Sequence, residues 1–158
     1  MSDFKARVRR ALTNHHANLI KKYASTRKNK KPEKEVEAIA MAWMRAKDWD
    51  VEIYEAKATF DPKRQIWRQQ AMKAGVCDCM GLDNLANAVF VEFKAPGRRS
   101  DFNSDRKYKQ KKFLTDKIHR GAFGVVIDSV AELERIYSQW LAIDSRKEKI
   151  AYLISELP

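Results

Sequence analysis

Charged side chains end a strongly apolar segment near the middle of the chain, residues 88–94 with the sequence AVFVEFK. If this segment is a strand, Glu92 and Lys94 lie about 7 Å apart along it on one face. The opposite face is then wholly apolar, formed by Val89, Val91 and Phe93. A strand this apolar is expected in the interior, where a carboxylate and an ammonium need partners or a metal ion.

A second acid, Asp78, stands alone in another apolar segment, residues 76–80 with the sequence VCDCM. If the two segments pair as strands, Asp78 and Glu92 meet on the same face. Carboxylates about 4 Å apart repel, so one holds a proton unless a cation lies between them. Two carboxylates, water and a backbone carbonyl, that of Phe93, suit Mg²⁺ or Mn²⁺. Such an ion activates water and polarises a phosphoryl oxygen, and Lys94 could stabilise the charge that develops on the phosphate.

This arrangement resembles the PD-(D/E)xK nuclease superfamily, with Asp78 as the first acid and Glu92-Phe93-Lys94 as the E-x-K element. Residues 75–78 resemble the G-x-x-D element, and residues 89–97, VFVEFKAPG, resemble the strand and exit of the virus-type replication-repair nuclease group. That group also has Q-x-x-F-L, G and V-V elements in this order, and the chain has similar residues in the same order: Gln110, Phe113, Leu114, Gly121, Val125 and Val126. The whole resemblance extends over about residues 32–128.

The resemblance implies a restriction-endonuclease-like core, αβββαβ, and further site residues. An acid of the first helix would join the metal site, with Glu33 as the best match and Glu37 as the alternative. Gln110 would lie beside the site and orient Lys94 or a water molecule. Helix spacing independently places Gln110 on the core-facing side, and an amide satisfied by backbone groups is the alternative to a role in the site. The chain departs from the family at Cys77, where members often have proline.

The remaining patterns predict how the elements follow one another. A basic helix over residues 4–24 and a charged linker over 25–31 form an N-terminal arm, and residues 32–158 form the nuclease-like domain. Helices are expected from Pro32, over 103–120, from the capping box at Ser129 and from about 145, with strands over 51–56, 76–80, 88–94 and 123–128. The first three strands are predicted to pair antiparallel and the fourth to join by a crossover. The fold class is α/β, a mixed sheet flanked by helices.

Composition narrows the partners of the chain. The length of 158 residues fits about one domain, and no apolar run reaches the roughly 20 residues needed to span a bilayer. The N-terminus lacks the apolar region of a secretory signal, so we expect a cytoplasmic protein of a bacterium or of a phage-infected cell. A net charge of +11 predicts a polyanionic partner, nucleic acid before a membrane surface.

The two cysteines, Cys77 and Cys79, would share one face of a strand and are too close in sequence for an unstrained disulfide. They fall short of the four ligands of a structural zinc site, and the three histidines lack finger spacing. We therefore expect two buried thiols.

Basic residues interleaved with an aromatic one suggest a DNA-facing loop over residues 61–75, with a surface segment pinned by Trp67 as the alternative. The basic residues after the E-x-K strand and in the next helix extend this prediction. The predicted DNA-contacting residues are Lys63, Arg64, Trp67, Arg68, Lys73, Arg98, Arg99 and Lys107.

These expectations combine into a hypothesis of a Mg²⁺- or Mn²⁺-dependent DNA endonuclease. The resemblance suggests cutting of branched or junction DNA in phage or mobile-element replication, recombination or repair, with a homodimer supplying two active sites. A site-specific nicking enzyme is a variant of the same chemistry, and a non-catalytic DNA-binding module is the alternative. Substitution of Asp78 by alanine separates these, because a nuclease loses cutting but keeps DNA binding.

Overall fold

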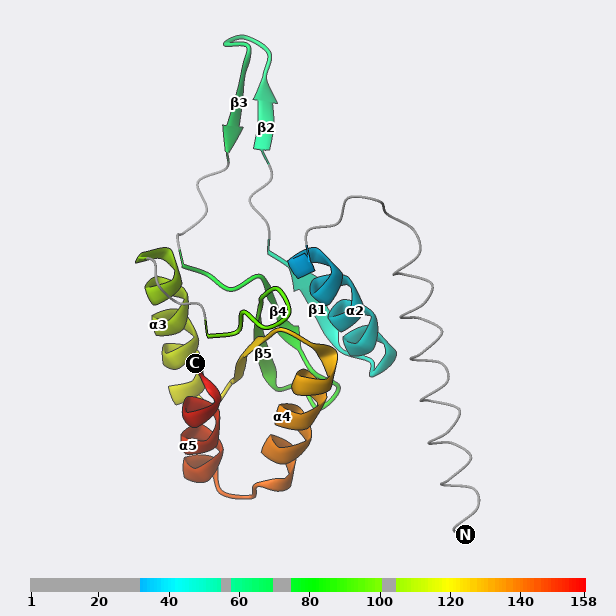
Figure 1. Cartoon of the computed structure of the whole chain (residues 1–158), viewed down its shortest axis with the longest axis vertical. Coiled ribbons are helices and arrows are strands. Elements are labelled where there is room, and N and C mark those ends of the chain that lie inside the picture. The colour runs from blue at the N-terminus through cyan, green and yellow to red at the C-terminus, as the bar shows by residue number, and fades with distance from the viewer. Residues whose placement is uncertain (1–31, 55–57, 70–74, 101–104) are drawn as a thin grey trace.

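The computed structural model describes residues 32–54, 58–69, 75–100 and 105–158 (Figure 1). The predicted helix over residues 4–24 and the linker over 25–31 lie outside the described residues, as does Lys73. In chain order the described elements are α2 (Pro32–Ala46), β1 (Asp50–Ile53), β2 (Ala58–Asp61), β3 (Ile66–Gln69), β4 (Cys79–Leu82), β5 (Ala88–Phe93), α3 (Asp105–His119), β6 (Phe123–Ile127), α4 (Val130–Ala142) and α5 (Arg146–Glu156).

Within the described residues, four strands form a mixed sheet in the order β1-β4-β5-β6. β1, β4 and β5 are antiparallel neighbours, whereas β6 follows the α3 crossover and runs parallel to β5. The predicted α/β class, with a mixed sheet flanked by helices, is confirmed. β4 begins at Cys79 rather than at residue 76, so Asp78 lies just before the strand.

The segment between β1 and β4 contains a hairpin where the sequence predicted a loop, so that prediction was wrong. β2 and β3 pair antiparallel, with Phe60 opposite Trp67. The turn at residues 62–65 lacks the glycine that usually marks a hairpin, and Gln65 itself takes the left-handed backbone conformation, with φ +52°. The Gln65 side-chain amide donates to the Pro62 carbonyl at 3.0 Å. Figure 1 shows the hairpin standing away from the sheet, at the end where α2 and α3 begin.

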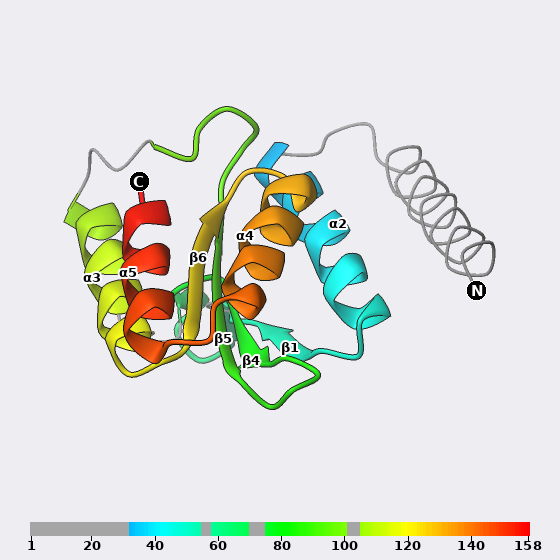
Figure 2. The same ribbon diagram turned by 90° about the horizontal axis from the view of Figure 1, so that it is seen from below.

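The main core lies between the sheet and two helices. α2 and α4 lie on one side of β6, and α3 and α5 on the other (Figure 2). The apolar face of β5 packs into this core through Val89, Val91 and Phe93, each 0% exposed. Trp49 meets Tyr137 edge to face, with ring centroids 4.7 Å apart, and Trp43 and Phe123 extend the cluster. Edge-to-face rings add stability beyond burial alone, so this cluster joins α2 and α4 to the sheet.

α3 covers part of the opposite face of the sheet. Leu114 and Val126 are buried there, together with the partly buried Phe90. A side chain on Gly124 would place its Cβ 2.8 Å from Ile118, so β6 needs a glycine where α3 crosses it. The face that carries Glu92 is therefore buried under α3 rather than open to solvent.

Cys77 and Cys79 are both buried and unoxidised, as expected, but they do not share a face. Cys79 lies in the main core, whereas Cys77 packs against α3 with Leu114. The prediction of one shared face was wrong because alternation holds only inside a strand, and Cys77 precedes β4. No helix in the described ranges has the length and apolar character to cross a membrane.

Candidate active site

The site forms where β4 begins and β5 ends. The Phe93 N–H donates to the carboxylate of Asp78 at 3.0 Å, and the Asp78 carbonyl accepts from the Tyr54 N–H at 2.7 Å. Asp78 therefore provides the partner of the Phe93 N–H one residue before β4 begins. Its carboxylate bonds to the end of β5 and its carbonyl to Tyr54, the residue after β1.

Glu92 is the buried acid of the site, at 1% exposure. One of its oxygens, Oε1, pairs with the Lys94 ammonium, whereas Oε2 has no hydrogen-bond partner among the described residues. Burial, followed by the negative charge of Asp78, raises the pKa of Glu92 to about 7, against the lowering effect of Lys94. This is the behaviour expected of a buried carboxyl group that also has a second carboxylate nearby.

Lys94 is also buried, at 8% exposure. Its backbone N–H donates to the Ile127 carbonyl of β6 at 2.8 Å, which extends the parallel pairing one residue past β5. Because Glu92 and Lys94 are two residues apart on this extended backbone, their side chains share a face, as the alternation predicted. The buried pair gives the site one fixed positive charge.

A divalent cation fits this donor set. The Glu92 and Asp78 carboxylates lie close enough to interact with each other, and both are hard oxygen ligands. The N–H and C=O of one strand residue point the same way, so the Phe93 carbonyl is directed toward Asp78 as its N–H is. No group of three or more His, Cys, Asp or Glu side chains within the described ranges could hold a metal. Two carboxylates nevertheless match Mg²⁺, which keeps several of its water ligands.

The further residues that the family resemblance implies are placed as follows. Gln110 is buried, at 3% exposure, on α3 one turn before Leu114, which packs on the Glu92 face. Glu33 is exposed. Glu37 is half-buried, pairs with Lys34 at 2.8 Å, and is one of the charges that raise the pKa of Cys79, after burial and Asp78. Glu37 therefore lies nearer the start of β4 than Glu33 does.

The predicted DNA-contacting residues fall into different settings. Lys63 and Arg64 are exposed at the hairpin turn, and Arg98 is exposed in the loop after β5. Trp67 and Arg68 belong to β3, and Lys107 to α3. The predicted residues of the hairpin, Lys63, Arg64, Trp67 and Arg68, therefore lie on a different element from Arg98, which follows β5.

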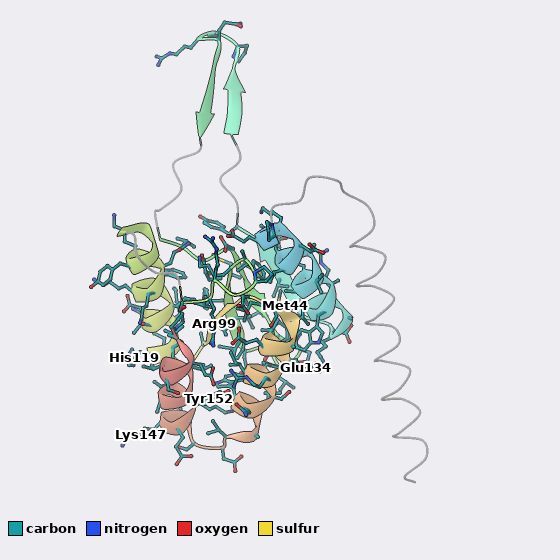
Figure 3. The ribbon with its side chains drawn as sticks, in the orientation of Figure 1. Met44, Arg99, His119, Glu134, Lys147 and Tyr152 are labelled. Atoms are coloured by element: carbon teal, nitrogen blue, oxygen red, sulfur yellow. The ribbon has the colours of Figure 1, made fainter. Side chains whose placement is uncertain are left out.

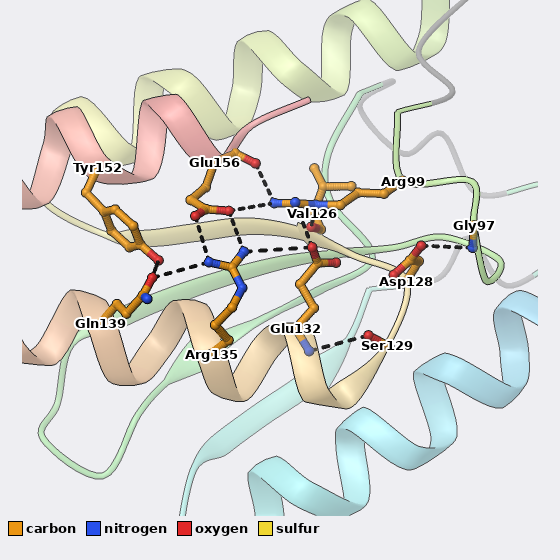
Figure 4. Close-up of polar contacts among 10 residues, drawn as sticks. All are labelled: Gly97, Arg99, Val126, Asp128, Ser129, Glu132, Arg135, Gln139, Tyr152 and Glu156. Carbon is orange, nitrogen blue, oxygen red and sulfur yellow. Dashed lines mark hydrogen bonds and ion pairs between the residues drawn. The ribbon is translucent and has the colours of Figure 1, made fainter.

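Arg99 has to be removed from the predicted DNA-contacting set. Its guanidinium pairs with Glu132 at 2.7 Å and bonds to Glu156, and its Nε donates to the Val126 carbonyl at 2.8 Å (Figure 4). The side chain is 21% exposed and lies in the middle of the fold (Figure 3). Arg99 therefore ties the loop after β5 to α4 and α5. Composition and position along the chain cannot distinguish an inward arginine from an outward one.

Sequence reasoning missed an open hollow of about 330 Å³ at β1 and β4. It is lined by residues of these strands, among them Asp50, Glu52 and Met80, and by Tyr54, which follows β1. Tyr54 is 43% exposed, and its backbone bonds to Asp78. Asp50, Glu52 and Tyr54 alternate along the chain and so share one face, and this alternation was the sequence signal that could have indicated the hollow. The hollow runs along β1 and β4, and neither Asp78 nor Glu92 lines it.

Comparisons with protein-family models, with curated proteins and with solved structures find no match to this chain.

Proposed function

We propose that this protein is a metal-dependent endonuclease that hydrolyses phosphodiester bonds in DNA. The observation that carries the proposal is the convergence of Asp78, Glu92 and Lys94 at the end of β5, with one Glu92 oxygen left without a partner among the described residues. A restriction-endonuclease-like arrangement of the sheet and the PD-(D/E)xK resemblance are part of the same proposal.

Each residue has a separate task in the reaction. A bound Mg²⁺ or Mn²⁺ would polarise a phosphoryl oxygen and lower the pKa of water. Asp78 and Glu92 would hold that ion, with the Phe93 carbonyl beside them. The Lys94 ammonium, held in place by Glu92, stabilises negative charge that develops on the phosphate in the transition state. Gln110 lies on the helix that covers this face and would orient a polar group of the site.

The substrate side of the proposal rests on charge. With a net charge of +11, the protein attracts the phosphate backbone of nucleic acid. We propose branched or junction DNA as the substrate, cut by a homodimer, in phage or mobile-element DNA processing. A site-specific nicking activity would use the same residues.

The test is cleavage of labelled four-way junction, flap, nicked and linear duplex DNA with Mg²⁺ or Mn²⁺, by the wild type and by Asp78→Ala. We expect the wild type to cut the junction in preference to linear duplex, and the variant to lose cutting at least about 100-fold while it keeps DNA binding. Undiminished cutting by Asp78→Ala would overturn the site. Binding without any cutting, on these substrates and on a plasmid and genomic DNA panel, would leave a DNA-binding module.

A further inference from the structure

The β2–β3 hairpin is attached to the chain directly beside the candidate site. It is carried by the segment that leaves the sheet after Tyr54 and returns before Asp78, and these two residues are hydrogen-bonded at 2.7 Å. Figure 1 shows the hairpin projecting from the end of the molecule where α2 and α3 begin. Glu37 and Gln110 lie in the first halves of these two helices. A molecule held by the hairpin is therefore brought to the end of the fold where Asp78 lies.

The tip of the hairpin is basic. Lys63 and Arg64 are exposed at the turn, which the amide of Gln65 closes onto Pro62. The hairpin as a whole, residues 58–69, contains three basic residues and one acidic residue, so a polyanion is the complementary partner.

The dimensions of the hairpin favour one polyanion. Each arm has four residues, which corresponds to a length of about 10 Å at the usual rise of a strand. The major groove of DNA is roughly 12 Å wide and 8.5 Å deep and admits a two-stranded β-ribbon. The arms are thus long enough for the tip to reach the floor of the groove while the base of the hairpin remains outside it.

We infer that the β2–β3 hairpin inserts into the major groove of duplex DNA and so makes a duplex segment, rather than single-stranded DNA, the ligand of this end of the protein. The inference rests on the proposed function, because the duplex bound by the hairpin is taken to be part of the DNA substrate that the site cuts. It adds the double-stranded character of that part and the element that recognises it.

Equilibrium binding tests the inference separately from cutting. The double variant Lys63→Glu/Arg64→Glu is compared with Arg120→Glu/Lys147→Glu, which changes the charge equally at exposed positions away from the hairpin. Figure 3 shows Lys147 at the end of the molecule opposite the hairpin. Both are made in the Asp78→Ala background, so that no DNA is cut, and fluorescence anisotropy measures binding to a labelled 30-base-pair duplex and to its single strand over a range of salt.

We expect the hairpin variant to bind duplex about tenfold more weakly than the control variant, with a salt slope lower by about two, and to match the control on single strands. Equal duplex binding by the two variants would overturn the inference and leave the hairpin to a protein partner. An equal loss on duplex and single strand would also overturn it, because groove insertion requires a duplex. If the charge-reversal variant has a lowered melting temperature, the variant Lys63→Ala/Arg64→Ala is used in its place. It should show the same selective loss of duplex binding, by a smaller factor.

These outcomes are distinct from a failure of the proposed function. If the hairpin binds duplex but the wild type cuts no DNA, the inference holds and the proposed nuclease function fails. If the wild type cuts DNA but the hairpin variant binds duplex like the control, the nuclease function holds and the inference fails.

Discussion

Asp78 carries two kinds of contact through one side chain. Its carboxylate accepts from the Phe93 N–H, which lies opposite the residue before β4 begins, and its charge lies close enough to raise the pKa of Glu92. Alanine removes both contacts, and the lost hydrogen bond alone is worth about 1 kcal/mol. Asp78→Asn keeps an acceptor for Phe93 and removes the charge, so it is the cleaner variant wherever stability matters.

Substitution of Lys94 is expected to change the rate of DNA cleavage without changing the affinity for the metal ion. In Lys94→Met the stem length is kept and the ammonium is lost, so we expect DNA cleavage to slow by about 10²–10³-fold. Cation binding should persist, because the carboxylates that would hold the ion are unchanged. Single-turnover cleavage and cation-dependent melting measure the two effects.

Lys112→Met is the matched control for that variant, since Lys112 is exposed on α3. It should cut like the wild type. If Lys94→Met lost cation binding together with its rate, Lys94 would be a structural partner of Glu92 and not a group that acts on the phosphate.

At the scale of the elements, an ion-pair network holds the loop after β5 in place. Arg99 and Arg135 converge on Glu156 at the end of α5, and both approach Glu132 on α4 (Figure 4). Asp128 extends the arrangement by accepting from the Gly97 N–H at 2.9 Å. Because Lys94 lies just before this loop, the network fixes the path of the chain as it leaves the candidate site.

Glu156 gives this network a defined pH dependence. Its hydrogen bond with Arg135, together with the charges of Arg135 and Arg99, lowers the pKa of Glu156 below its ordinary value near 4.5. A lowered pKa means that the folded state binds this proton less readily than the unfolded state, so the stabilisation is present above pH 4.5 and is lost as the pH falls through the lowered pKa. The contribution of a partly exposed pair is below about 1 kcal/mol.

We therefore expect Glu156→Gln to be less stable than the wild type at pH 7 and to lose less stability between pH 5 and 2. Urea unfolding at several pH values measures both. Glu134→Gln is the control, because Glu134 is exposed on α4 (Figure 3). A difference between Glu156→Gln and the wild type that does not change with pH would rule out the ion pairs as its cause.

The sequence predicted the elements with a clear period and missed those without one. α2 and α4 have apolar residues at helical spacing, and β5 alternates cleanly, so each was found close to its true bounds. β2 and β3 were missed because Gln65, and not glycine, takes the left-handed position of their turn. Alternation placed Glu92 beside Lys94. It could not orient Arg99, because the direction of a side chain in a loop depends on tertiary packing.

At the scale of the whole molecule, negative charge is concentrated where the chain would bind a cation. The protein as a whole has a charge of +11, yet Asp78 and Glu92 are close neighbours at one end of the sheet, with Asp50 and Glu52 lining the adjoining hollow. Neighbouring like charges oppose folding, most of all at Glu92, which is the buried one of the two carboxylates. A ligand that neutralises them should therefore stabilise the entire fold.

A bound cation stabilises the native state by an amount set by its concentration relative to its dissociation constant. At 100 times that constant the gain is about 2.7 kcal/mol, or roughly 5–10 °C in melting temperature for a chain of this size. We expect Mg²⁺ or Mn²⁺ to raise the melting temperature of the wild type by this order, EDTA to reverse the shift, and Asp78→Asn to abolish it. Glu134→Gln should respond like the wild type. A shift of equal size in Asp78→Asn would mean that the cation binds elsewhere, because Asp78 supplies one of only two carboxylates proposed to hold it.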